Sequence, residues 1–240
     1  MEALQRLHNR GSISTGYDID NSCKFEDDND EYLYRTNASG TNRKTWTVSW
    51  WFKQTEIPST RSSYVEHWQG GVYGEATRAG IDNNDRLWID VGGGDGNTGT
   101  LFRSLSTARL RDTSAWYHVV IACDSTQSTE ADRLKVWLNG VEVTSWDQHQ
   151  IPTLNFQSAL QGTGGVVMKW GSYDATYNGY SGYLAECHYL DGVTATQNDF
   201  GEFDSDSGIW KPKEYTGSYG TNGSYLDFKT ASDLGANAKG

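Results

Sequence analysis

Three strand-like segments and a tight-turn dipeptide fall within residues 116–144, WYHVVIACDSTQSTEADRLKVWLNGVEVT, and they limit the folds that this chain can adopt. Residues 116–123 are rich in β-branched and aromatic side chains, and apolar residues alternate along 134–138, as in a half-buried strand. Asn139 and Gly140 tolerate the positive φ angles of a type I′ turn, and a period of two resumes after them. The pattern predicts a β-hairpin with one face in a hydrophobic core.

A second alternating segment, TWTVSWWFK at residues 45–53, indicates another strand with one core face. That face carries Trp46, Val48, Trp50 and Phe52. In the 134–138 strand, the same reasoning places Val136 in the core and Lys135 in solvent. Trp51 falls on the outer face of its strand, where it is either covered by a loop or exposed as a binding platform. A covering loop is the favoured interpretation.

The composition argues against several classes of function. A formal net charge of -11 and a pI near 4.8 are unsuited to binding nucleic acid or an anionic membrane through a basic face. No run approaches the roughly 20 apolar residues of a membrane span, and the N-terminal MEALQRLHNRG lacks the apolar core of a signal peptide. We therefore expect a soluble protein made in a cytoplasm, with no nucleic acid partner and no membrane insertion. The three cysteines have no CxxC spacing and are expected to be buried free thiols.

Short strand-like segments recur along the rest of the chain. The candidates are 23–25, 32–34, 64–68, 86–91, 166–170, 183–190 and 225–228. Thr196 is a candidate N-cap for one helical turn ending near Phe200. The stretches 146–164 and 202–224 are rich in turn residues and are expected to be connections. Roughly a dozen short strands with almost no helix predict an all-β fold, a two-sheet antiparallel jelly-roll sandwich in a single domain.

This interpretation divides the chain into three parts. Residues 1–20 form an N-terminal attachment arm with no core of its own. Residues 21–230 form the jelly-roll domain. Residues 231–240, which are small and show no periodicity, form a flexible tail or the start of a linker to further modules.

Several segments resemble a known family. TWTVSWWFK, SAWYHVVIACD and RLKVWLNGVEV resemble the concanavalin A-like (laminin G-like) lectin/glucanase jelly rolls. The version of this domain in tail-fibre and other virion proteins of marine tailed bacteriophages is similar to NRKTWTVSWWFK, GYLAECHYLDG, DFGEFDSDSGIWKPKEYTGSYGTNGSYLDF and SDLGANAKG. The resemblance runs from about Cys23 to the end of the chain. In similar proteins the last motif leads into further modules, which would make this chain a fragment of a longer polypeptide.

The residues do not form a catalytic pattern. Glucanases of this fold use carboxylates at alternate positions of one strand as general acid and nucleophile. Here Glu186 is followed by His188 and Leu190, and Asp191 would point to the opposite face. We therefore expect a protein that is not an enzyme, with glycoside hydrolysis as a minor alternative. The acidic run at 26–31 lacks the spacing of an EF-hand, so a solvated loop is favoured over a calcium site and no cofactor is expected.

Two non-enzymatic functions follow from the resemblance. In the first, the domain is a lectin-like adhesion module of a virion tail fibre or spike, a homotrimer that contacts host surface polysaccharide. In the second, it is a structural virion component that docks to other virion proteins as a fibre, decoration or adaptor. Exposed aromatic rings would serve either function. The expected contact residues are Trp68, Tyr73, Trp146, Tyr173, Tyr177 and Tyr180.

Overall fold

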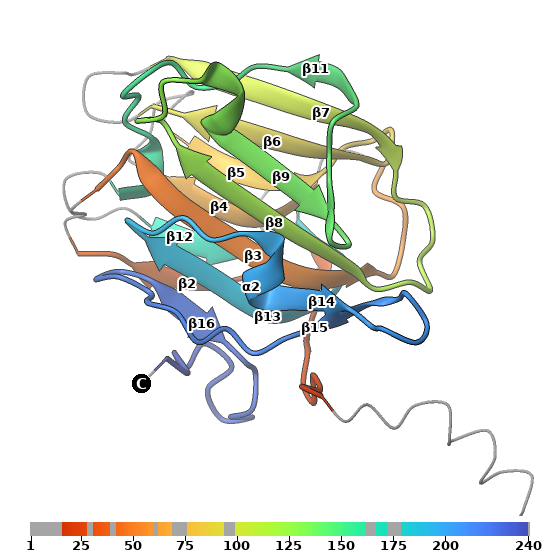
Figure 1. Cartoon of the computed structure of the whole chain (residues 1–240). Coiled ribbons are helices and arrows are strands. Elements are labelled where there is room, and N and C mark those ends of the chain that lie inside the picture. The colour runs from red at the N-terminus through yellow and green to blue at the C-terminus, as the bar shows by residue number, and fades with distance from the viewer. Residues whose placement is uncertain are drawn as a thin grey trace, which may run out of the picture.

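Two antiparallel sheets pack face to face in the computed structural model (Figure 1), which describes residues 16–27, 31–38, 42–59, 62–68, 76–93, 99–161, 167–171 and 179–239. Sheet A has the strand order β1-β13-β3-β8-β9-β10, and β16 also pairs with β13. Sheet B has the order β11-β7-β6-β5-β4-β12-β2. The predicted all-β jelly-roll sandwich is confirmed. Within the described residues, no helix has the length and apolar character needed to cross a membrane.

The secondary-structure elements are short. Sheet A consists of β1 (Cys23–Phe25), β3 (Thr45–Gln54), β8 (Tyr117–Asp124), β9 (Leu134–Leu138), β10 (Val141–Glu142), β13 (Gly182–Asp191) and β16 (Ser224–Leu226). Sheet B consists of β2 (Leu33–Thr36), β4 (Ser62–Trp68), β5 (Ala76–Ile81), β6 (Arg86–Gly92), β7 (Leu101–Arg109), β11 (Trp146–His149) and β12 (Val167–Trp170). The other elements are the 3-10 turns η3 (Glu130–Asp132) and η4 (Ala159–Gln161), the helical turn α2 (Gln197–Phe200), and β14 (Gly201–Phe203) and β15 (Trp210–Pro212).

The main core lies between the two sheets. Alternate residues of β3 enter it as predicted, namely Trp46, Val48, Trp50 and Phe52. Val136 of β9 is also buried there, whereas Lys135 is partly exposed and forms ion pairs on the surface. Asn139 and Gly140 have φ angles of 48° and 80°, so the hairpin turn is confirmed. All three cysteines are buried and free.

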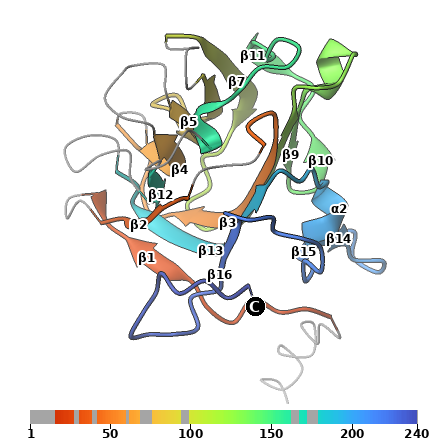
Figure 2. The same ribbon diagram turned by 90° about the vertical axis from the view of Figure 1, so that its left-hand side faces the viewer.

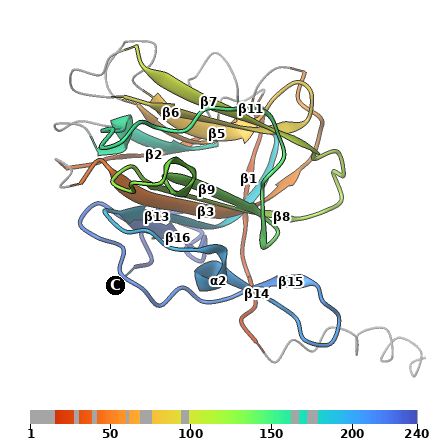
Figure 3. The ribbon, with the colours of Figure 1, turned by 45° about the horizontal axis from the view of Figure 1, so that its top comes forward.

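A third layer covers the outer face of sheet A. It contains α2, the β14–β15 hairpin and the C-terminal segment, which lie on the opposite side of sheet A from sheet B (Figure 3). Thr196 is the N-cap of α2, as predicted, and it forms a capping box with Asp199. In this layer Trp210 of β15 packs against Trp51, which is therefore covered rather than exposed.

Three expected irregular stretches carry more structure than their sequences suggest. The expected connection at 146–164 contains β11, an edge strand held by pairing with β7. The expected connection at 202–224 contains β15, which pairs with β14. In residues 231–240, expected to form a flexible tail or the start of a linker, the Ala238 N–H donates to the Tyr225 carbonyl over 2.8 Å and the Asn237 side chain accepts from the Tyr225 N–H.

Both ends of the described chain lie beside sheet A. Figure 2 shows the first described residues and the C-terminus on the same side of the molecule. Part of the expected arm, from Tyr17 onward, packs on the outer face of sheet A. Residues 1–15 of the arm and residues 28–30 of the acidic run lie outside the described residues, so the predictions for these segments stay predictions.

Candidate functional site

Strand β13 has a bulge where its partners change. Its register with β3 shifts between Ala185 and His188, and Glu186 has a positive φ of 47°. The sequence pattern places Ala185 and Cys187 on one face. The bulge instead leaves Cys187 in the core with Leu184, while Ala185 and His188 reach the outer face. Strict alternation therefore does not hold through this strand, which lies inside sheet A with β3 on one edge and with β1 and β16 on the other.

The bulge coincides with a break along one edge of β13. β1 pairs with Gly182–Leu184, and β16 pairs with Cys187–Tyr189 on the same edge. Glu186 therefore lies where one short partner strand ends and the other begins. His188 is directly opposite Tyr225 of β16, so the two side chains leave the sheet together.

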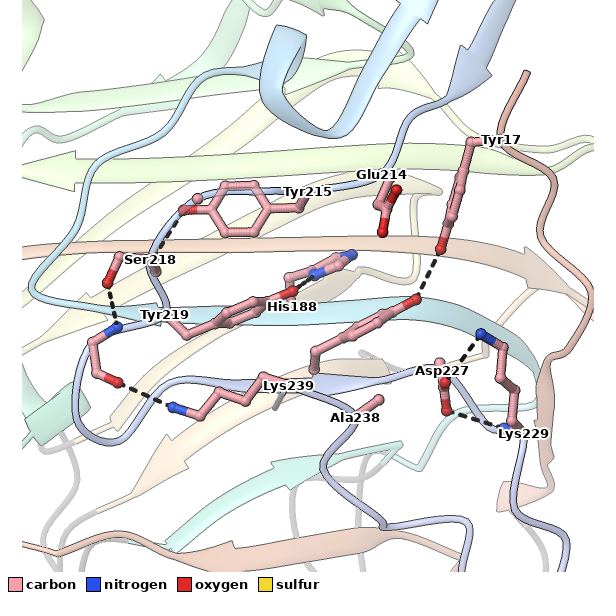
Figure 4. A pocket seen from close by; sticks show the side chains of 13 residues that line it. Tyr17, His188, Glu214, Tyr215, Ser218, Tyr219, Asp227, Lys229, Ala238 and Lys239 are labelled. Carbon is pink, nitrogen blue, oxygen red and sulfur yellow. Dashed lines mark hydrogen bonds and ion pairs between the residues drawn. The ribbon is translucent and has the colours of Figure 1, made fainter. Parts of the chain in front are cut away.

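These side chains form the floor of a pocket of about 600 Å³, which we call the tyrosine pocket (Figure 4). Its aromatic wall consists of Tyr17, His188, Tyr215, Tyr219 and Tyr225. Its charged rim consists of Glu214, Asp227, Lys229 and Lys239. The volume is in the usual range for small-ligand sites.

Three rings in the pocket are nearly parallel. The His188 and Tyr225 rings have centroids 4.4 Å apart and an interplanar angle of 5°. The Tyr219 ring is 6.0 Å from His188, at an angle of 23°. Tyr215 stands edge-on to Tyr219 and stacks on Phe200 of α2, so the third layer fixes its position. The wall is therefore a preorganised aromatic surface.

Glu186 is buried beneath these rings and accepts hydrogen bonds from two phenols. The Tyr17 hydroxyl donates to Oε2 over 2.7 Å, and the Tyr225 hydroxyl lies 2.8 Å from Oε1. The two phenol oxygens are also 2.9 Å apart. A buried carboxylate is costly without partners, so these hydroxyls satisfy Glu186 and hold the strained bulge. Tyr17 thereby ties the N-terminal segment to the sheet.

His188 is held as a neutral imidazole. Burial lowers its pKa, and the neighbouring Glu186 carboxylate opposes that shift only in part. Nδ1 lies 2.9 Å from the Tyr219 hydroxyl, while Nε2 is 3.7 Å from Glu186 Oε2. A proton on Nε2 would face the carboxylate and leave Nδ1 to accept from Tyr219. The tautomer of His188 with its proton on Nε2 therefore suits both Glu186 and Tyr219.

The phenols of the pocket stay protonated at neutral pH. Burial raises the pKa of Tyr17, Tyr219 and Tyr225, and the charge of Glu186 raises each of them further. Each hydroxyl can therefore donate a hydrogen bond. On the rim, Lys239 donates to the Gly220 carbonyl over 3.0 Å and lies 5.8 Å from the centre of the Tyr219 ring.

The loop that brings in Tyr219 is anchored to the end of β13. The Asp191 N–H donates to the Tyr219 carbonyl over 2.9 Å. Asp191 Oδ2 accepts from both the backbone and the side-chain nitrogen of Asn222, over 2.8 and 2.9 Å. Asp191 thus has a structural role at this loop. Among the described residues, no three His, Cys, Asp or Glu side chains are placed to hold a metal ion.

Of the residues expected from the sequence to make contacts, Tyr180 and Trp146 have described side chains, and neither lines the tyrosine pocket. Tyr180 is only 1% exposed, and its hydroxyl donates to the Lys53 carbonyl, so its prediction as a surface contact is wrong. Trp146 is half-buried on β11 and stacks on His149 at 4.5 Å. Trp68 belongs to β4, but its side chain is outside the described part of the structure. Tyr73, Tyr173 and Tyr177 also lie outside the described residues.

The sequence analysis missed the tyrosines that do come together. Tyr215, Tyr219 and Tyr225 fall within EYTGSYGTNGSYLDF, a segment rich in Gly, Ser and Tyr. That density of Tyr among small residues was the available signal, since it is typical of adaptable binding loops. Tyr17 is distant in sequence and gave no such signal.

Comparison with solved structures supports the fold. A native heptameric SAP-like pentraxin from Limulus polyphemus superposes with a TM-score of 0.53 at 15% identity, over 88% of this chain and 94% of that one. A NanB structure, the sialidase of Streptococcus pneumoniae, matches with a TM-score of 0.50 at 13% identity, over 78% of this chain and 29% of that one. Tailspike protein 2 of bacteriophage CBA120 matches at 0.46 and 14% identity, over 74% of this chain and 26% of that one.

Comparison of the sequence gives the family. No curated protein sequence matches this chain significantly. The family model described as the concanavalin A-like lectin/glucanases superfamily matches residues 27–192, which is more than half of the chain. The chain belongs to the concanavalin A-like lectin/glucanase superfamily.

Proposed function

We propose that this chain is a lectin-like binding module that holds a glycan in the tyrosine pocket. The observation that carries the proposal is the stack of His188, Tyr219 and Tyr225 at the floor of a pocket with a charged rim. A sugar ring has an apolar C–H face and a periphery of hydroxyls. Flat aromatic rings suit the face, and phenols, carboxylates and ammonium groups suit the periphery.

We propose further that the module does not cleave its ligand. Hydrolysis of a glycosidic bond usually needs one carboxyl group as acid and a second as nucleophile or base. Glu186 is buried, and its carboxylate accepts hydrogen bonds from the hydroxyls of Tyr17 and Tyr225. These two hydrogen bonds would be lost if the carboxyl group transferred a proton to a substrate. The neutral state of His188 fits a hydrogen-bonding role better than that of an acid.

A glycan array followed by titration calorimetry tests the binding site. Tyr219→Ala removes one ring of the stack and should weaken binding about tenfold, which is about 1.4 kcal/mol. Tyr34→Ala is the matched control, because Tyr34 is 68% exposed on β2 of sheet B. We expect the control to bind as the wild type does. Failure of the chain to bind any glycan would refute the function, and full binding by Tyr219→Ala would refute the site.

We propose a virion as the biological setting, with the module as an adhesion part of a bacteriophage tail fibre or spike. The support is the similarity of its motifs to virion proteins of marine tailed phages. A homotrimeric fibre would repeat a weak glycan site and raise avidity by roughly 10²- to 10⁴-fold. Residues 1–20 would act as the attachment arm. Deleting residues 1–16 should leave the melting temperature almost unchanged but prevent incorporation into particles, and normal incorporation would remove this role.

A structural virion component is the second candidate. The β14–β15 hairpin favours it, because Phe203 is 51% exposed and Ile209 is 66% exposed. Exposed apolar side chains of this kind suit a contact with a neighbouring subunit. Phe203→Ser with Ile209→Ser would then abolish assembly without changing glycan binding, whereas an adhesion module would assemble normally with both substitutions.

A further inference from the structure

A second cavity lies on the outer face of sheet A, and we call it the tryptophan groove. It has a volume of about 330 Å³ and is walled by Trp51, Trp116 and Trp210. Trp116 is 39% exposed, whereas the other two indoles are nearly buried. Asn21 and Lys211 are among the polar residues that line it. The groove thus combines indole surface with polar groups.

The back wall of the groove is rigid. His118 of β8 stacks on Trp51 with ring centroids 4.7 Å apart and on Trp210 with centroids 6.0 Å apart. Trp210 Nε1 donates to His118 Nδ1 over 3.0 Å, and His118 Nε2 lies 2.9 Å from Ser49 Oγ. Gly140 packs so closely on Trp210 that a Cβ there would meet the indole. The two inner indoles are therefore fixed before any ligand arrives.

The groove adjoins the tyrosine pocket along three separate segments of the chain. On the N-terminal segment, Tyr17 lines the pocket and Ile19 lines the groove. On the segment after β15, Pro212 lines the groove and Glu214 lines the pocket. Successive residues of extended chain are at most about 3.6 Å apart, so a spacing of two residues separates the cavities by roughly 7 Å.

Strand β13 is the third segment that contributes residues to both cavities. Ala185 contributes to the groove and His188 to the pocket, with the Glu186 bulge between them. The residues between the cavities on the other two segments are Asp18 and Lys213, and both are exposed. A ligand that passed from one cavity to the other would meet these charged side chains.

We propose that the tryptophan groove is a second subsite for the same glycan, so that the ligand is an oligosaccharide that spans both cavities. This inference rests on the proposed function of the tyrosine pocket. The Trp116 indole presents an apolar surface for the C–H face of a further sugar ring, and Asn21 presents hydrogen-bonding groups for its hydroxyls. The Lys211 ammonium already pairs with Glu202 and Asp204, over 3.2 and 3.4 Å. Lys213 donates to the Asn198 carbonyl over 3.0 Å and keeps two further N–H groups, which together with Asp18 bind hydroxyls at the junction. An apolar peptide side chain suits the indoles but offers no hydrogen bond to Asn21.

Chain-length dependence of affinity tests the inference. The glycan identified on the array is prepared as a ladder from monosaccharide to hexasaccharide, and its dissociation constants are measured for the wild-type chain and for Trp116→Ala. Affinity of the wild type should rise along the ladder. Trp116→Ala should lose about tenfold on the longest member and nothing on the monosaccharide. Tyr219→Ala should weaken every member. Tyr34→Ala is again the control, since Tyr34 is 68% exposed on β2 of sheet B.

The outcomes separate the two proposals. If Trp116→Ala binds every member of the ladder as the wild type does, while Tyr219→Ala is weakened, the second subsite is wrong and the glycan function stands. If affinity does not change along the ladder, the second subsite is also wrong. If neither the monosaccharide nor the hexasaccharide binds the wild type, both proposals fall. Equal melting temperatures of the variants exclude unfolding as the cause of a loss.

Discussion

Acid should weaken this fold through His118, which is enclosed in the third layer. The side chain is 1% exposed and lies between the indoles of Trp51 and Trp210. Because Trp210 Nε1–H donates to His118 Nδ1, a proton on that nitrogen would face another donor. Burial and, to a lesser extent, the positive charge of protonated His188 together lower the pKa of His118 to about 3.

The sign and size of the effect follow from this pKa. Between the ordinary histidine pKa of 6.5 and about 3, the unfolded chain binds a proton at His118 that the folded chain does not. The stabilisation is therefore complete above pH 6.5 and is lost as the pH falls. Each pH unit well inside that window removes about 1.4 kcal/mol and the loss sets in gradually around pH 6.5, so acidification from pH 7.5 to 4.5 should remove roughly 3 kcal/mol from the free energy of unfolding.

Urea denaturation followed by tryptophan fluorescence measures the free energy of unfolding at pH 7.5 and at pH 4.5. Carboxylates and His188 also titrate, so the test compares the wild type with His118→Gln. Glutamine keeps an oxygen that can accept from Trp210 Nε1–H, but it does not titrate. The variant starts less stable because it loses the ring stack, and it should lose roughly 3 kcal/mol less than the wild type on acidification. Equal losses in the two proteins would refute the assignment to His118.

Three further predictions address the core, the hairpin turn and the chemistry. Val136→Asp should unfold the domain in thermal melts, because Val136 is 2% exposed, whereas Lys135→Gln should stay within about 0.5 kcal/mol of the wild type; similar melting temperatures would overturn the register of β9. Gly140→Ala should cost roughly 2 kcal/mol in denaturant titrations, because a Cβ at φ 80° is strained and would lie 2.2 Å from the Trp210 ring; an unchanged midpoint would show that this contact can relax. The wild-type chain should release no reducing sugar from β-glucans, and release that Glu186→Gln abolished would make it an enzyme.

Most of the fold could be predicted from the periodicity of apolar residues in the strands. The apolar residues at every second position from Trp46 to Phe52 identified the face of β3 that enters the main core, because a shift of one residue would turn all four away from that core. The Asn139-Gly140 turn fixed the β9–β10 hairpin in the same local way. β11 was missed, since it is a short edge strand whose polar side chains carry no alternation and whose position depends on pairing with β7.

The site could not be predicted in this way, because it depends on contacts between distant segments. The bulge at Glu186 has no glycine or proline to mark it, and the carboxylate is satisfied by Tyr17, which is 169 residues away in sequence. For Tyr180 the error was the opposite one, because a buried residue was expected to be exposed. Its neighbours are turn residues, yet its ring packs on Tyr64 in the core at a centroid distance of 4.4 Å. Local composition therefore separated exposed from buried tyrosines poorly.

The most direct test of the central claim is a crystal structure of the full chain with the glycan that binds most tightly on an array. The account predicts sugar density on the outer face of sheet A, with one ring in contact with the aromatic wall at Tyr219 and Tyr225. Hydroxyls of that sugar should lie within hydrogen-bond distance of the charged rim. Density on sheet B, with the tyrosine pocket occupied only by water, would contradict it.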